Sequence, residues 1–197
     1  AWPRIEKISG KFLIDRNKLE VKSSSARTLT ANLQNVTATI PDLLSENLLL
    51  KVSGEATAES SVFLQYIQHS PVRGYVDGFT DHIAASGNGQ LNLLLGIPLS
   101  GMRPVKVNGI FSVQDSDIDF GVGVPWLRHT KGELSFTESG MHAKDVATQI
   151  LGGIANLNVD SVENGAVHAT AHGRADLDVM RATYPSPLLN AIHGSTV

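Results

Sequence analysis

The chain contains no cysteine, and only 6% of its 197 residues are aromatic and 18% charged. The lack of cysteine excludes disulfides, a thiol nucleophile and cysteine-ligated metal. A net charge of −3 excludes the basic footprint of a nucleic-acid-binding protein. No apolar run approaches the ~18 residues that a membrane-spanning helix requires. Because the chain begins Ala1-Trp2-Pro3, without a starting Met or a signal peptide, we expect residues 1–197 to be a fragment of a longer protein.

A glycine followed by one apolar spacing occurs three times in the chain. Apolar residues stand two, four, nine and eleven positions after Gly10, Gly109 and Gly132. They are Phe12, Ile14, Leu19 and Val21; Phe111, Val113, Ile118 and Phe120; and Leu134, Phe136, Met141 and Ala143. A period of two places residues on one face of a strand, and the polar residues between the pairs reverse the chain. Each unit is therefore predicted to be a β-hairpin with one apolar face.

Alternation of apolar and polar residues predicts further strands at 28–40, 47–58, 84–95, 146–160 and 166–177. The strand at 84–95 contains Leu91 and Leu93 on the same face as each other. A helical spacing replaces the alternation at 60–80 and again at 177–193, and proline interrupts both stretches. The pattern predicts a mainly β fold, a large antiparallel sheet elongated by successive hairpins, with short helical hairpins.

The two halves of the chain align with each other. Eight residues recur at an offset of 122, from Pro3, Ile5, Gly10, Phe12, Ile14, Leu19, Val21 and Lys22 to Pro125, Leu127, Gly132, Leu134, Phe136, Met141, Ala143 and Lys144. The chain is therefore predicted to hold one repeat at 1–122 and part of a second at 123–197. A unit of this length is too long for a propeller blade or a common solenoid repeat.

Several motifs occur in a familiar order and spacing over nearly the whole chain. They are Val124-Pro125-Trp126-Leu127 with Gly132-Glu133-Leu134-Ser135-Phe136, the weaker copy at residues 2–5 and 10–14, the block at 70–76, and residues 85–93 with Ile97-Pro98-Leu99. In this arrangement the chain resembles the periplasmic AsmA-like family, and within it the YhdP family. The resemblance implies a β-groove, a strongly bent antiparallel sheet whose concave side carries phospholipid.

The resemblance further implies what the protein does and where. It implies non-enzymatic transport of phospholipid acyl chains between the inner and outer membranes, in the periplasm of a Gram-negative bacterium. An inner-membrane anchor and the regions that contact membranes would lie outside these residues, and no cofactor is implied. The expected groove lining comprises Phe12, Ile14, Leu19, Val21, Leu91, Leu93, Phe111, Val113, Ile118, Phe120, Leu134, Phe136 and Met141.

Other candidate sites are weaker. His168 and His172 lie four residues apart in a predicted strand and could suggest a metal pair, but they lack a companion acid. The acidic run at 115–119 fits a solvated turn and strand better than a Ca²⁺ loop. No clustered acid, base and nucleophile is recognisable, so we predict no metal site and no enzymatic activity.

Two alternatives stay open from the sequence. The apolar stripe fits the core of a β-sandwich, and the repeated sheet fits a structural or interaction array of the envelope without lipid cargo. The pattern does not decide which strand face is concave, nor the oligomeric state. On the groove hypothesis an aspartate at Val113 would block lipid passage without unfolding the sheet, whereas in a sandwich it would unfold the protein.

Overall fold

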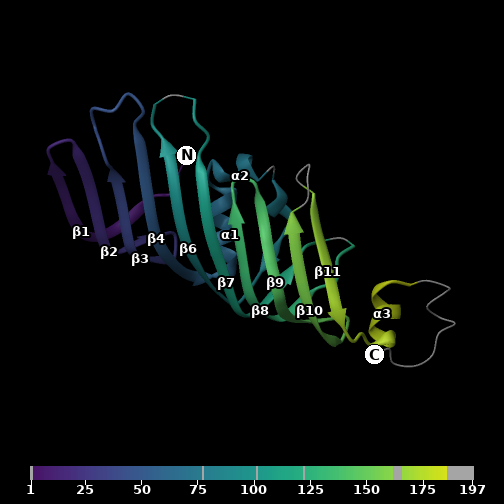
Figure 1. Ribbon diagram of the computed structural model, residues 1–197. Coiled ribbons are helices and arrows are strands. Elements are labelled where there is room, and N and C mark those ends of the chain that lie inside the picture. The colour runs from purple at the N-terminus through teal and green to yellow at the C-terminus, as the bar shows by residue number, and fades with distance from the viewer. Residues whose placement is uncertain (1, 77, 101, 122, 162–165, 186–197) are drawn as a thin grey trace.

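The computed structural model describes residues 2–76, 78–100, 102–121, 123–161 and 166–185, and it shows one large antiparallel sheet (Figure 1). Neighbouring strands follow the order β1 (Ile5–Asp15), β2 (Lys18–Thr28), β3 (Ala31–Ile40), β4 (Leu49–Glu59), β6 (Asn88–Pro98), β7 (Lys106–Asp119), β8 (Leu127–Thr137), β9 (Gly140–Ile150), β10 (Gly153–Ser161) and β11 (Val167–Gly173). The short β5 (Ala84–Ala85) pairs with β7. Within the described residues β1 and β11 form opposite edges, so the sheet is not closed. The predicted mainly β fold is confirmed.

Two of the three predicted hairpins are present. β1 and β2 pair Ile14 with Leu19, and β8 and β9 pair Phe136 with Met141. In both hairpins the polar residues that follow the first apolar pair form the turn. The spacing of four and nine positions after the glycine therefore identifies residues that face each other across these turns.

The hairpin predicted after Gly109 is wrong, because β7 runs without a turn from Lys106 to Asp119. Asp115 lies in the left-handed region at φ 50°, where the register of β7 against β8 shifts. A β-bulge of this kind adds one residue to the strand and so reverses its alternation. A two-residue turn changes the alternation in the same way. The apolar spacing alone therefore does not distinguish a bulged strand from a hairpin.

The other predicted elements differ from the observed ones mainly at their ends. The strand predicted at 146–160 is wrong, because a turn with positive φ at Leu151 and Gly152 separates β9 from β10. The helical stretch after β4 forms α1 (Ser60–Gln68), α2 (Val72–Tyr75) and the 3-10 helix η1 (Phe79–His82). After β11 the chain forms α3 (Leu177–Thr183). The remainder of the helical prediction, at 186–193, lies outside the described residues.

The predicted repeat has a counterpart in the strand boundaries. β8 begins and ends 122 residues after β1, and β9 begins and ends 122 residues after β2. Backbone irregularities recur at the same offset, since Lys7 and His129 both have positive φ, as do Leu29 and Leu151. The division into repeats at 1–122 and 123–197 itself stays a prediction.

Bulges cross the middle of the sheet. Lys7, Asn35, Asp115, His129 and Asp145 have positive φ in the interiors of β1, β3, β7, β8 and β9, and the ladders shift register at each. Four of these five are Asn, Asp or His, the side chains that tolerate the left-handed region best after glycine. Because a bulge bends and twists its strand, this series bends the sheet across the strand direction.

The helical segment between β4 and β6 packs on one face of the sheet. The Phe63 ring of α1 meets the Phe111 ring of β7 edge-on, with ring centroids 5.1 Å apart. In Figure 1 α1 and α2 lie behind the strands on that face. The segment covers the sheet over its middle strands.

Candidate functional site

One face of the sheet is apolar from strand to strand. A single row of laterally paired residues, called the apolar row below, crosses nine strands from β2 to β11. Its members are Ala26, Leu33, Ala56, Leu91, Phe111, Leu134, Ala143, Val159 and Ala169. Directly paired residues of neighbouring strands project from the same face. The row therefore forms an uninterrupted apolar path perpendicular to the strands.

A parallel row completes this face at the N-terminal side. Phe12, Val21, Ala38, Val52, Leu95 and Val107 are paired in turn across β1, β2, β3, β4, β6 and β7. We call the side of the sheet that carries both rows the apolar face.

The thirteen residues predicted to line a groove lie together on the apolar face. Twelve are strand residues; Phe120 directly follows β7 and packs against the same hydrophobic cluster as Leu134. Their exposure to solvent varies. Phe12 and Ile14 at the β1 edge are 64% and 56% exposed, whereas Val113 is 7% exposed. The pairing places these side chains on one surface, and their contact with lipid stays a prediction.

The apolar face is buried where it crosses β8, β9 and β10. Its buried cluster comprises Leu127, Ala143, Val146 and Leu157 of β8, β9 and β10. The helical segment packs mainly on β4, β5 and β6. Ile118, Phe120 and Leu134 pack against this cluster, so these side chains cover part of one another on the apolar face.

None of the four members of this cluster was in the expected groove lining, although Ala143 belongs to the repeated apolar spacing. Leu127 and Val146 reach the apolar face because the bulges at His129 and Asp145 change the alternation of β8 and β9. Leu157 stands two residues from Val159 on β10 and so projects from the same face. The sequence signal for such a bulge is a polar residue that tolerates positive φ inside an otherwise alternating strand.

The opposite face of the sheet is polar. Its pairing across β1 to β8 runs through Lys11, Lys22, Thr37, Ser53, Leu94, Asn108 and Thr137. Leu94 is the apolar exception in this row, and it is 55% exposed. The contrast between the two faces is the pattern of a sheet with one solvated side.

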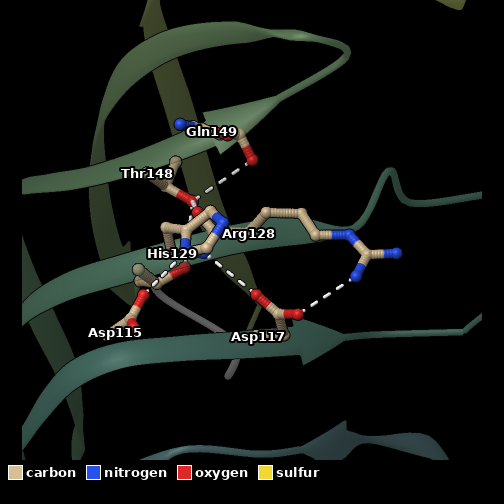
Figure 2. A network of polar contacts seen from close by, with 7 residues as sticks. Asp115, Asp117, Arg128, His129, Thr148 and Gln149 are labelled. Carbon is tan, nitrogen blue, oxygen red and sulfur yellow. Dashed lines mark hydrogen bonds and ion pairs between the residues drawn. The ribbon is translucent and has the colours of Figure 1, made fainter.

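Side-chain contacts on the polar face hold the bulges of β7 and β8 together (Figure 2). His129 Nδ1 lies 2.6 Å from Asp115 Oδ1, and the His129 backbone N–H donates to Asp117 at 3.0 Å. Arg128 also donates to Asp117, at 3.0 Å. The acidic residues considered for Ca²⁺ are thus occupied by neighbouring protein groups, and Asp119 accepts from the Gly121 backbone N–H.

These contacts shift the pKa values of Asp117 and His129. The hydrogen bond from the His129 backbone, followed by that from Arg128, lowers the pKa of Asp117. The hydrogen bond and charge of Asp115 raise the pKa of His129 above 6.5. His129 is exposed and Asp117 is partly exposed to solvent, so each effect on stability is small.

The raised His129 pKa gives the protein a pH-dependent contribution to stability. Protonated His129 stabilises the fold fully below its unfolded pKa of about 6.5, and this stabilisation is lost as the pH rises through the higher folded pKa. We expect the difference in thermal unfolding midpoint between the wild type and Asp115→Asn to shrink between about pH 6 and pH 8. Asparagine keeps the tolerance for positive φ at the bulge. A difference that does not change with pH would contradict this origin of the stabilisation.

The described residues contain no group of three or more His, Cys, Asp or Glu side chains arranged to hold a metal ion. The same part of the chain contains no helix that is long and apolar enough to cross a bilayer. The most extensive feature on which a function can be built is therefore the apolar face.

The fold and this face together define a class of protein, an open and bent antiparallel sheet that presents a long apolar surface. The chain belongs to the YhdP family, whose model, described as YhdP protein, matches residues 1–197. This match confirms the resemblance inferred from the sequence motifs. Comparison with curated proteins and with solved structures gave no match. Membership of this bacterial envelope family suggests a lipid-transport-related role, and the family is generally not enzymatic.

Proposed function

We propose that this chain is a non-enzymatic lipid-transfer segment of the periplasm, and that its apolar face carries phospholipid acyl chains between the inner and outer membranes. The observation that carries the proposal is the apolar row, which continues across nine strands without a polar residue. Membership of the YhdP family supports it independently.

The dimensions of the apolar row suit lipid tails. With strands about 4.8 Å apart, the eight intervals of the row extend roughly 38 Å if straight. The hydrocarbon core of a bilayer, which two opposed lipids fill tail to tail, is about 30 Å thick. The row is thus long enough to accommodate complete acyl chains laid perpendicular to the strands.

The free energy of moving lipid through water explains why such a surface is useful. Exposing an acyl chain costs ~0.8 kcal/mol per methylene, so two chains of ~15 methylenes cost on the order of 24 kcal/mol. Contact with apolar side chains offsets most of this cost at every position along the sheet. No pocket chemistry is needed, which agrees with the lack of a recognisable catalytic cluster in the sequence.

The exposure of the apolar face argues for cargo rather than a closed core. Phe12 and Ile14 are more than half exposed, and the described strands form one sheet, not two facing sheets. Soluble proteins rarely leave large apolar surfaces uncovered unless they bind something there. A structural array without cargo would have no use for this surface.

A matched pair of crosslinking positions tests the proposal. Leu93 and Leu94 are adjacent leucines of β6 that project from opposite faces, Leu93 beside Gly54 and Leu94 beside Ser53. We expect a photo-crosslinking residue at Leu93 to capture phospholipid in cells that produce the protein at its native length. The same residue at Leu94 should capture several-fold less, because the polar face offers no apolar path.

The outcomes separate the rival functions. Capture at Leu93 with little at Leu94 supports transfer along the apolar face. Equal capture at both positions would indicate nonspecific contact with membranes. Lack of lipid at Leu93 in a folded and abundant variant would reject the proposal and favour the structural array.

A further inference from the structure

The helical segment that contains α1, α2 and η1 leaves and rejoins the sheet at one point. β4 and β6 are direct neighbours, and Glu59 at the end of β4 is paired with Asn88 at the start of β6. The Ser60 backbone N–H donates to Gly87 at 2.8 Å, where Gly87 has φ 85°. The intervening residues are therefore an excursion from a continuous ladder rather than a part of it.

The excursion is braced within itself. Arg73 donates to both carboxylate oxygens of Asp81, at 3.0 Å to Oδ1 and 2.6 Å to Oδ2. Gln68 donates to the Thr80 carbonyl at 3.4 Å, and the Gly78 backbone N–H donates to the Arg73 carbonyl at 3.1 Å. These contacts tie α1, α2 and η1 into one unit.

This unit covers the apolar row at its centre. Phe111, the fifth of the nine row members, is the residue on which Phe63 stacks. Gly89 lies beneath both rings, because a Cβ at this position would stand 2.7 Å from the Phe111 ring and 3.1 Å from the Phe63 ring. The missing side chain lets α1 approach the sheet closely. An acyl chain that follows the row from β2 to β11 meets the Phe63 ring there.

We propose that Phe63 controls passage along the apolar face, and that the unit formed by α1, α2 and η1 is a gate that separates lipid over β1–β4 from lipid over β8–β11. This inference rests on the proposed transfer function. The Phe63 ring lies on Phe111, where an acyl chain following the apolar row would also have to lie. Lipid therefore crosses the middle strands when the Phe63 ring moves off Phe111. Phe63 thus determines whether lipid can pass the middle strands during transfer.

The test places a photo-crosslinking residue on each side of the gate, at Leu19 on β2 and at Met141 on β9. In cells producing the native-length protein, we measure the ratio of phospholipid captured at the two positions. Phe63→Ala widens the path and Phe63→Trp narrows it. We therefore expect the ratio to change in opposite directions in the two variants, by about twofold or more. Leu64→Ala, which removes a similar apolar side chain from the same helix, should leave the ratio as in the wild type.

The outcomes distinguish failure of the gate from failure of the transfer function. If lipid is captured at both positions but neither Phe63 variant changes the ratio, the gate is overturned and transfer stands. If neither position captures lipid, the proposed function fails and the gate fails with it.

Hydrogen exchange of the wild-type protein provides a second test, which does not depend on a variant that folds. The amides of α1 should exchange faster than those of β6 and β7, and equal protection would overturn the gate.

Discussion

Replacing Leu93 by aspartate is expected to reduce lipid transfer by about tenfold or more while the sheet stays folded. Leu93 stands on the apolar face between Gly54 of β4 and Gly109 of β7, and the Phe136 ring lies over Gly109. Leu93 is partly exposed, so a carboxylate there keeps part of its hydration. An acyl chain passing the charge must displace that water, and about 1.4 kcal/mol of added barrier already gives a tenfold loss of rate.

Leu94→Asp is the matched control. It introduces the same charge one residue further along β6, on the polar face, where Leu94 is 55% exposed. Lipid transfer by the native-length protein and thermal unfolding are measured for both variants. Normal transfer in folded Leu93→Asp would reject a conduit on this face. An equal loss in both variants would show that charge on β6 acts through something other than the lipid path.

The apolar face was predictable because side-chain alternation in a strand depends only on sequence spacing. Phe12, Leu93 and Phe136 were placed on one face from period-two patterns within separate strands. The order of strands followed from short connections, which favour antiparallel neighbours. These are local properties, so one sequence sufficed to derive them.

The turn predicted after Phe111 failed for a physical reason that applies generally. A bulge at Asp115 and a two-residue turn both change the alternation by one residue, and both favour polar side chains. The distinction depends on whether the second half of the strand has a partner further along the same ladder. Here Ser116 and Ile118 continue their pairing with Thr130 and Leu127 of β8, which is a long-range property.

The curvature of the sheet and the position of the helical segment were beyond the sequence for a related reason. Helical spacing at Ser60–Gln68 predicted α1 but not the surface on which it packs. The contact between Phe63 and Phe111 depends on the lack of a side chain at Gly89, in a different strand from either ring. Curvature likewise comes from bulges on several strands acting together, which no single segment of sequence specifies.

Val113→Asp is expected to unfold the protein rather than to block transport in a folded sheet. The sequence suggested this position as an exposed lining residue, but Val113 is only 7% exposed. It pairs with Gly89 on one side and Gly132 on the other. A Cβ at Gly132 would stand 2.8 Å from the Val146 side chain, so the surface beside Val113 is closely packed. This part of the apolar face is therefore buried and closely packed, unlike the exposed part at β1.

A carboxylate at this position has little water around it, because Val113 is buried. Breaking such a site by leaving a charge unpaired costs ~3–5 kcal/mol, a large part of the ~5–15 kcal/mol that stabilises a typical domain. Denaturant unfolding measures the loss, and Ile110→Asp provides the control, because Ile110 lies in the same strand and is 39% exposed. We expect Ile110→Asp to cost less than about 1 kcal/mol, as surface substitutions do. A Val113→Asp variant as stable as Ile110→Asp would show that the surface around Val113 is open to water. Val113 would then belong to the lipid-lining surface, as the sequence suggested.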